Sequence, residues 1–386
     1  MLDAEGGVLN GMASKSAQPS GDPGPGKTIG RMRIQDVAQA ASVSITSVSN
    51  YLNNRHQRLG ADTRARIAQA ISDLGFRPNQ AAQQLKTGKK SVIGLVAPSI
   101  VNPFNGGMVF AIEQAAFRSG YGVYLCNTMR DRRIERRFME NLGASNVTDL
   151  ITVAPILSRR GAGPVARDNL SIVAVDASRA DMGLPRVDTI NVDHEAAIEL
   201  AVDHLYELGH RHIAYVTDPI ITYSRAMRRS GFDRSMARRD LDAGAVLTVE
   251  RTQDIADLNM VEAGKLAAAQ LLSLPQRPTA VVAFNDMIAL GLMTELRVAG
   301  ISVPKDLSLV GVDDIWTGQL FSPALTSIRQ PIEAMAEAAV ERIVNPVNSQ
   351  IGAGSDTTFQ PALIVRDTTA TVPRNVRQGK RGMQPA

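Results

Sequence analysis

From about residue 91 onward, the sequence alternates short β-branched or aliphatic runs with longer amphipathic segments. The run Val92–Val96, for example, is followed by the helical pattern Gly106–Arg118 and then by the run Val123–Cys126. Strands that alternate with helices in this way are typical of parallel sheets covered by helices on both faces. Residues 91–373 are too many for one such sheet, so we predict an α/β region of two doubly wound parallel-sheet lobes.

The two lobes are expected to exchange segments near the C-terminal end of the chain. We place an N-lobe at residues 91–190 plus 330–360 and a C-lobe at residues 191–329 plus 361–373. In sheets of this kind, ligands bind outside the carboxyl ends of the strands. A small molecule is therefore expected in the crevice between the lobes.

The segment that precedes the lobes has helical periodicity alone. Ile34, Val37 and Ala41 lie on one stripe of a short helix, and Ser44 can cap a second helix. Asp62 can cap a third helix. We divide the rest of the chain into a disordered leader at 1–30, an all-α domain at 31–78, a short helix and linker at 79–90, and a disordered basic tail at 374–386.

Charge is distributed unevenly along the chain. The whole chain has a net charge of +4, whereas residues 31–90 carry ten basic and three acidic residues. A compact basic module beside a nearly neutral bulk is typical of nucleic-acid binding. A merely solvated basic surface remains the alternative on charge alone.

Composition excludes several other classes of protein. Cys126 is the one cysteine, which excludes an intramolecular disulfide framework and a thiolate zinc cluster. No apolar run reaches the roughly 18 residues of a membrane span, and the first thirty residues contain no apolar signal segment. We therefore expect a cytoplasmic protein without a membrane partner.

Residues Arg33–Asn53 resemble the helix-turn-helix of LacI-family bacterial transcription regulators, and the match continues through Leu74-Gly-Phe-Arg-Pro-Asn79. The resemblance extends into the lobes at Asn102-Pro-Phe104, Asn285-Asp286 and Leu309-Val-Gly-Val-Asp-Asp314. It implies a helix-turn-helix domain at 31–78, joined by a hinge helix to a periplasmic-binding-protein-like effector domain.

The resemblance also implies which residues contact DNA. Ile45, Thr46 and Asn50 match base-reading positions, and four further residues match phosphate contacts: Ser44, Ser47, Ser49 and Asn53. Asparagine can pair with adenine through two hydrogen bonds. The alternative is that these small polar side chains cap and solvate an ordinary surface helix. Two departures from the family pattern, Ser42 in place of Gly and Asn50 in place of Arg, put the operator sequence in doubt.

The segment Asn79–Leu85 resembles the hinge helix of the family. By that resemblance, Leu85 is an apolar wedge for the minor groove at the centre of the operator, with Ala82 beside it. Such wedges unstack and kink DNA. The alternative is that Leu85 packs within an interdomain linker.

The family's effector contacts map onto residues that follow or flank strand ends. The polar candidates are Asp176, Arg228, Asn285 and Asp313, and the aromatic candidates are Phe104 and Trp316. Carboxylate, guanidinium and amide groups suit the hydroxyls of a sugar, since each can make paired hydrogen bonds. The alternatives are core packing for the aromatic residues and, for acids at strand ends such as Asp314, capping of the following helix.

These observations predict a homodimeric or tetrameric repressor that binds a pseudo-palindromic operator under the allosteric control of a sugar-like effector. Motifs of catalytic nucleophiles, phosphate-binding loops and zinc proteases are missing, so we expect neither an enzyme nor a cofactor. His204, His210 and His212 are expected to be structural and not metal ligands. The competing classes are a transporter's binding protein and an architectural DNA binder.

Overall fold

A computed structural model describes most of the chain, in two compact units that divide between Lys89 and Lys90. The described residues are 32–53, 55–76, 92–145, 147–155, 170–182, 187–219, 222–241, 245–249, 260–345 and 354–372. The expected hinge residues Ala82 and Leu85, the leader at 1–30 and the tail at 374–386 lie outside these ranges. Each unit is described by itself.

The first unit is a small helical domain. Its helices are α1 (Ile34–Ala40), α2 (Ile45–Leu52) and α3 (Ala61–Asp73), with a 3-10 turn at His56–Arg58. The apolar stripes of the three helices meet in one core: Val37, Ala38, Ala41, Val48, Ile67, Ala70 and Phe76. The expectation that Asp62 caps α3 is wrong. Gly60 occupies the N-cap position, and Asp62 lies in the first turn, 3.3 Å from Arg66.

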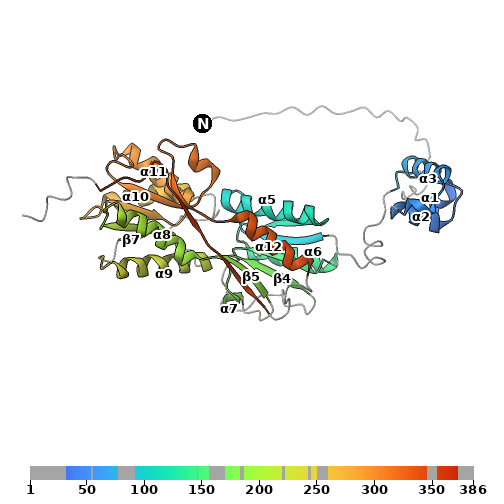
Figure 1. The fold of residues 1–386 in the computed structure, drawn as a ribbon, viewed down its shortest axis with the longest axis horizontal. Helices are drawn as coiled ribbons and strands as arrows, with labels where there is room; N and C mark the ends of the chain where they lie inside the picture. Colours follow the sequence, from blue (N-terminus) through green and yellow to red (C-terminus); the bar gives the residue numbers. More distant parts are fainter. Residues whose placement is uncertain are drawn as a thin grey trace, which may run out of the picture. The chain divides into compact units, whose positions relative to one another are not determined.

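The second unit contains two lobes, and the expected fold class is confirmed (Figure 1). The N-lobe sheet has the order β11-β5-β4-β3-β1-β2, and all its strand pairs are parallel. Its strands are β1 (Val92–Ala97), β2 (Gly122–Asn127), β3 (Asp149–Val153), β4 (Ser171–Val175), β5 (Val187–Val192) and β11 (Asp356–Phe359). Its helices are α5 (Pro103–Arg118), α6 (Arg132–Ala144), α7 (Arg179–Met182) and α12 (Ile332–Val344).

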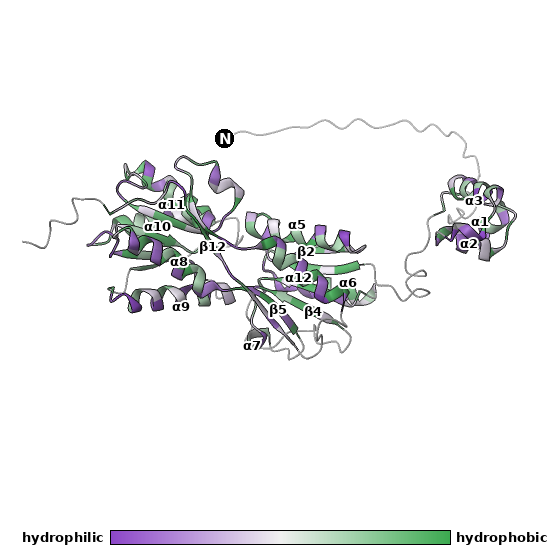
Figure 2. Ribbon diagram, in the orientation of Figure 1, coloured by the Kyte–Doolittle hydropathy of each residue, from purple (hydrophilic) through white to green (hydrophobic). Residues whose placement is uncertain are grey.

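Helices cover both faces of the N-lobe sheet, because alternate residues of each strand point to opposite faces. Ile151 and Val173 belong to the core that α5 and α12 cover, whereas Leu150 and Ile172 belong to the core that α6 covers. Burial on both faces explains why these strands are continuously apolar. Figure 2 shows the same contrast between hydrophobic strands and helices with hydrophilic outer faces.

The C-lobe repeats this arrangement. Its sheet has the order β12-β10-β9-β8-β6-β7, in which β12 alone among the described strands pairs antiparallel. The strands are β6 (Ile213–Thr217), β7 (Val246–Thr248), β8 (Ala280–Ala283), β9 (Ser308–Asp313), β10 (Thr326–Arg329) and β12 (Ala362–Ile364). The helices are α8 (His194–Glu207), α9 (Tyr223–Arg238), α10 (Met260–Leu272) and α11 (Asp286–Val298), with a 3-10 turn η2 at Trp316–Gln319.

The chain passes between the lobes three times, after β5, after β10 and after β11. In both sheets the order of strands reverses beside the first strand of the lobe, which is the switch point where α/β proteins of this type bind ligands. Among the described helices, none combines the length and the apolar composition that a bilayer crossing requires.

The two edge strands β7 and β11 were not predicted. β7 has three residues, and β11 reads Asp-Thr-Thr-Phe, so neither shows the apolar run that marks a buried strand. Both lie at the ends of their sheets, where one side of the strand has no partner. Edge strands of this kind carry little hydrophobic signal.

Two glycines allow the helices α10 and α11 to approach closely. A Cβ atom on Gly291 would lie 2.0 Å from the carbonyl oxygen of Val261, and one on Gly264 would lie 2.2 Å from that of Ile288. Both distances are far below van der Waals contact. This helix pair therefore packs backbone against backbone and buries one side of the C-lobe sheet.

We predict that Gly291→Ala destabilises the second unit by about 3 kcal/mol, the upper range for overpacking a core. Gly107→Ala in α5 is the matched control, since its Cβ would meet Ile332 at an ordinary 3.7 Å. The control should be neutral or more stable by up to about 1 kcal/mol. Urea unfolding followed by Trp316 fluorescence measures both, and equal effects of the two substitutions would contradict the close packing.

Candidate functional site

The second helix of the small domain is positioned by a capped turn. The Ser44 hydroxyl accepts a hydrogen bond from the Ser47 amide at 3.1 Å, which satisfies a free amide of the first turn of α2. Ser42 has φ of +53°, a left-handed conformation that usually favours glycine. The turn therefore keeps the geometry that glycine normally supplies, although a serine occupies it.

The candidate DNA contacts share one helix and differ in exposure. Ile45 is 46% exposed although it is apolar, whereas Val48, one turn later, is buried in the core. Thr46 and Asn53 are exposed, and Ser47, Ser49 and Asn50 are half-buried. Ser44 does cap the helix, as the alternative interpretation held, yet capping explains neither an exposed isoleucine nor the polar row beside it. The arrangement presents apolar, hydroxyl and amide groups on the exposed side of α2.

In the second unit, backbone strain gathers at the carboxyl ends of strands. Six non-glycine residues with positive φ end β2, β3, β4 and β9 or follow them within three residues: Met129, Arg130, Ala154, Asp176, Asp313 and Asp314. Such conformations cost free energy and cluster at functional sites. The carboxyl ends of the strands are also where the topology places a ligand, so the strain and the topology mark the same edge of each sheet.

Asp176 is held rigidly at the end of β4. Its backbone amide donates to the Ile190 carbonyl, and the Asn191 side chain brackets the next residue, Ala177, with two hydrogen bonds of 3.0 Å. The Asp176 carboxylate lies 2.8 Å from Nε2 of His194 and also accepts from Ser224. Although burial opposes it, His194 and Arg228 lower the pKa of Asp176 below its usual value, so the group is a carboxylate at neutral pH.

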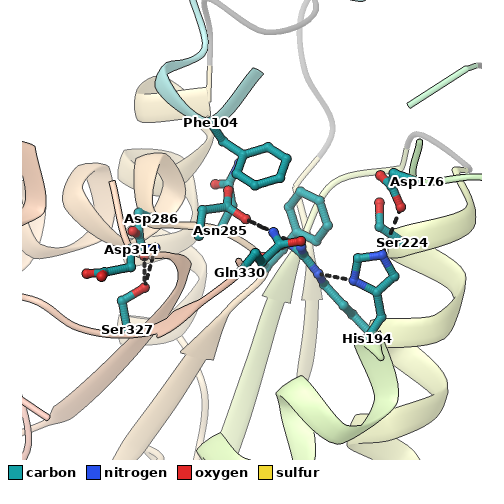
Figure 3. Close-up of polar contacts among 12 residues, drawn as sticks. Phe104, Asp176, His194, Ser224, Asn285, Asp286, Asp314, Ser327 and Gln330 are labelled. Carbon is teal, nitrogen blue, oxygen red and sulfur yellow. Dashed lines mark hydrogen bonds and ion pairs between the residues drawn. The ribbon is translucent and has the colours of Figure 1, made fainter. Parts of the chain in front are cut away.

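Arg228 lies in the interior of α9 and has a partner for each nitrogen of its guanidinium. It donates to the Phe284 carbonyl at 2.7 Å, to Nδ1 of His194 at 3.4 Å and to Asp313 at 3.4 Å. Asp313 also accepts from Gln330, in the crossover after β10, at 2.7 Å. The structure therefore brings together Asp176, Arg228 and Asp313, with His194 between the first two. Figure 3 shows the side chains of Asp176, His194 and Gln330 at this place.

Sequence reasoning missed the residues that join these three groups. His194, Ser224 and Gln330 are all buried or half-buried polar residues beside the predicted contacts. His194 opens α8 directly after Asp193, whose side chain caps that helix. A polar residue next to a helix start gives no periodic signal, so its burial could not be inferred from the sequence.

A second carboxyl lies deep beside Asp313. Asp286 accepts from the Ser327 hydroxyl at 2.6 Å and from the Ile315 amide at 2.8 Å. Gly311 makes room for it, because a Cβ there would lie 2.1 Å from the Asp286 carboxyl oxygen. Burial, together with the charge of Asp313, raises the pKa of Asp286 well above its usual value. Burial also raises the pKa of Asp313 to about 6.

Asn285 and Phe104 meet where the two lobes touch. The side-chain oxygen of Asn285 caps α11 by accepting a hydrogen bond from the backbone amide of Ile288. Its side-chain nitrogen donates to the Met260 sulfur at 2.8 Å. Asn102 of the N-lobe donates to the same sulfur at 3.6 Å. Phe104 packs against the cores of both lobes. A thioether is a weak acceptor, so these amides retain capacity to bind a better one.

Asp314 and Trp316 follow the last residue of β9. Asp314 does not cap η2, because its carboxylate pairs with Arg329 at 2.7 Å and with Arg366 at 2.6 Å. Trp316 begins η2 and is 67% exposed. Trp316 thus lies two residues beyond the strained strand end and makes none of the contacts of the Arg228 network that the described residues show.

Two histidines outside the network, His204 and His210, contact the segment that follows β12, whereas His212 contacts Gln276 at 3.1 Å. His204 contacts Thr369 at 2.9 Å, and His210 contacts Thr279 and the Ala370 carbonyl, each at 2.9 Å. Across the described ranges, no three His, Cys, Asp or Glu side chains are grouped so as to hold a metal ion.

The raised pKa of Asp313 predicts a pH-dependent stability difference. Because its pKa is about 6 in the folded state against an ordinary 3.8, this carboxyl stabilises the fold at low pH and loses that contribution as the pH rises through 6. Asp313→Asn cannot ionise. Its free energy of unfolding, relative to the unmodified chain, should rise by about 1–2 kcal/mol between pH 5 and pH 8.

Urea unfolding at the two pH values measures this difference. Asp306→Asn, at an exposed carboxyl, is the matched control. If the stability of Asp313→Asn relative to the unmodified chain stays constant from pH 5 to pH 8, then the surroundings of Asp313 do not raise its pKa.

Both units of the chain match families of known proteins. Residues 33–79 match the family "Bacterial regulatory proteins, lacI family", and residues 202–369 match the "Periplasmic binding protein-like domain". The HTH-type transcriptional regulator PtxS of Pseudomonas putida is 31% identical over 346 residues, which cover 89% of this chain and 98% of that protein.

Two solved structures are similar along most of their own length. The lac repressor dimer bound to operator and an anti-inducer has a TM-score of 0.73 and 26% identity, covering 88% of this chain and 99% of that one. A periplasmic binding protein/LacI transcriptional regulator from Alkaliphilus metalliredigens, complexed with D-xylulofuranose, has a TM-score of 0.61 and 29% identity, covering 72% and 99%. With these motifs, this fold and a relative matched over almost its whole length, the chain belongs to the LacI family of bacterial transcriptional regulators.

Proposed function

We propose that this protein is an operator-binding repressor whose affinity for DNA is set by a sugar-like effector bound between its lobes. One observation carries the proposal: the chain combines two sites. The first is an exposed helix-turn-helix surface, and the second is a buried network of acids and an arginine at strand ends with strained backbone. The lac repressor and the D-xylulofuranose complex, similar over most of their length, support the two halves of the proposal. The protein acts in the cytoplasm, without a cofactor and without catalysis.

On the DNA side, α2 enters the major groove. Its exposed Ile45 packs on a thymine methyl group, Thr46 and Asn50 read base edges, and Asn53 contacts phosphate. The remaining phosphate contacts come from the serines of the helix: Ser44, Ser47 and Ser49. Leu85, with Ala82 beside it, supplies the minor-groove wedge of the hinge segment.

On the effector side, the polar groups of the crevice recognise hydroxyls. Asp176 accepts, the Asn285 amide donates, and Arg228 with Asp313 forms the charged floor. Phe104 stacks on the apolar face of the sugar ring, and Trp316 covers the mouth of the crevice. Binding exchanges internal hydrogen bonds for bonds to the ligand and so changes the balance between lobe arrangements.

The homodimer is supported by apolar exposure on the N-lobe. Helix α5 exposes Phe110 to 66% and Phe117 to 72%, and the neighbouring edge strand β2 exposes Leu125, on the same face of the sheet, to 41%. Large apolar side chains exposed together on one side of a lobe are typical of a protein interface.

The Phe110→Glu, Phe117→Glu double substitution should therefore convert the dimer to a monomer in sedimentation equilibrium. Ile134→Glu on α6, which covers the other face of the N-lobe sheet, is the matched control and should leave the dimer intact. A double variant that sediments like the unmodified chain would exclude this surface as the interface.

Selection from random duplex DNA tests the DNA-binding role. It should return a pseudo-palindrome, because two copies of the helix-turn-helix read two half-sites. Asn50→Ala should then weaken binding to the selected site by about 1–3 kcal/mol while binding to unrelated DNA is unchanged. Gln69→Ala, at an exposed amide on α3, is the matched control.

Fluorescence anisotropy over a range of salt concentrations completes this measurement. Affinity for the selected site should fall steeply with salt, as phosphate contacts require. The proposal that α2 reads the bases would be contradicted if no sequence were selected. It would also be contradicted if Asn50→Ala and Gln69→Ala lowered the affinity for the selected site equally.

A further inference from the structure

His194 lies between charged residues that come from opposite lobes. Its Nε2 is 2.8 Å from the Asp176 carboxylate, which follows β4 of the N-lobe. Its Nδ1 is 3.4 Å from Nε of Arg228, on α9 of the C-lobe. The imidazole is 3% exposed, and no group of the described residues other than His194 contacts both of these side chains. The ring is therefore a direct polar link between the two sides of the crevice, beside the hydrogen bond from Ser224 of α9 to Asp176.

The two neighbours determine where the proton of the ring lies. Arginine has donors only, so Nδ1 must accept from the Arg228 Nε–H and carries no hydrogen. Nε2 then carries the hydrogen and donates it to Asp176, which is a carboxylate. Both contacts are satisfied only by the neutral imidazole with hydrogen on Nε2. A second proton, on Nδ1, would face the Arg228 guanidinium and lose that hydrogen bond.

The charged groups that face the ring act on its protonation in opposite directions. Asp176 comes from the end of β4, Arg228 from α9, and Asp193 precedes the ring on its own element. The Tyr223 ring packs edge-on, with centroids 5.8 Å apart. Burial, aided by Arg228 and opposed by the two carboxylates, lowers the pKa of His194 below its usual 6.5.

The helix that carries His194 is fixed to the helix that carries Arg228. A Cβ on Gly231 would lie 2.8 Å from the backbone of Glu195, so α8 and α9 touch directly. Ion pairs from Glu195 to Arg234 and from Glu199 to Arg238 run along the contact. Asp176 is likewise fixed to its own lobe by backbone bonds. A change in the His194–Asp176 contact is therefore a change between lobes and not within one.

We propose that His194 is a positioning residue that couples the lobes: as the neutral Nε2–H form it holds Asp176 and Arg228 in one arrangement, and a second proton on the ring releases that coupling. The proposal rests on the proposed function only in taking Asp176 and Arg228 as effector contacts. An effector that forms hydrogen bonds with Asp176 or Arg228 competes with His194 for the same groups. Acidification breaks one of these contacts of His194 without any effector.

Nitrogen NMR of the unmodified full chain tests the state of the ring without DNA or effector. The chain has five histidines, so selective labelling gives five imidazoles, and His194→Gln identifies the signals of His194. We expect the neutral Nε2–H form at pH 7.5, with protonation displaced below the usual range. Signals of the Nδ1–H form, or of a charged ring at pH 7.5, would overturn the proposal.

A distance measurement between the lobes tests the coupling. Spin labels at Arg136→Cys on α6 and Arg297→Cys on α11 report the arrangement, in a background with the buried Cys126 replaced by Ser. At pH 7.5 we expect one narrow distribution of distances between the labels, and this distribution should broaden or shift as the pH falls. His194→Phe, which keeps a ring but has no nitrogen, should show the broad or shifted distribution at pH 7.5.

Two further variants distinguish positioning from a purely structural role. His194→Gln keeps a donor towards Asp176 but cannot titrate, so it should restore the narrow distance and abolish its pH dependence. His204→Gln, at a histidine bonded to Thr369, is the matched control and should behave like the parent. A narrow distance in His194→Phe contradicts the proposal. The proposal is also contradicted if the distance between the labels still depends on pH in His194→Gln but no longer does so in Asp313→Asn. In that case the Asp313 carboxyl is the titrating group.

Discussion

The buried guanidinium of Arg228 is the group on which the arrangement of the crevice depends. A charge removed from water is destabilising unless it is paired and hydrogen-bonded on every side. Here the partners are the Phe284 carbonyl, the His194 ring and the Asp313 carboxylate, which come from the end of β8, the start of α8 and the end of β9. One cation thus fixes the positions of three separate elements, and through His194 it reaches Asp176 in the other lobe.

The carboxyl groups around this cation are held in different states. His194 and Arg228 keep Asp176 ionised, whereas burial raises the pKa of Asp313 to about 6 and that of Asp286 further above its usual value. A ligand that brings hydroxyl groups meets both acceptors and donors and changes the surroundings of each acid. Because Asp176 and Asp313 also have strained backbone conformations, the site stores free energy that a bound ligand can release or redistribute. Such a site is suited to switching between arrangements.

The sequence predicted those features that have a local signal. Alternation of apolar runs and helices indicated two parallel-sheet lobes, and the pattern around Ser44 and Val48 indicated a capped recognition helix. The edge strand β11 had no apolar run to reveal it. Asp62 was expected to cap a helix, and capping was one alternative for Asp314. Instead, Asp62 pairs with Arg66 one turn along its own helix, and Asp314 pairs with two arginines from later segments of the chain. Residues such as His194 acquire a function from contacts between distant segments, which periodicity does not encode.

The central claim is that the crevice network and the DNA-reading helix belong to one coupled system. The direct measurement is reciprocal linkage, with a monosaccharide found by thermal-shift screening and the operator found by selection from random DNA. Titration calorimetry gives the affinity for the sugar with and without operator, and anisotropy gives the affinity for operator with and without sugar. The account predicts the same fold-change in both, because coupling between sites is mutual. A sugar that binds at the crevice and leaves operator affinity unchanged would contradict it.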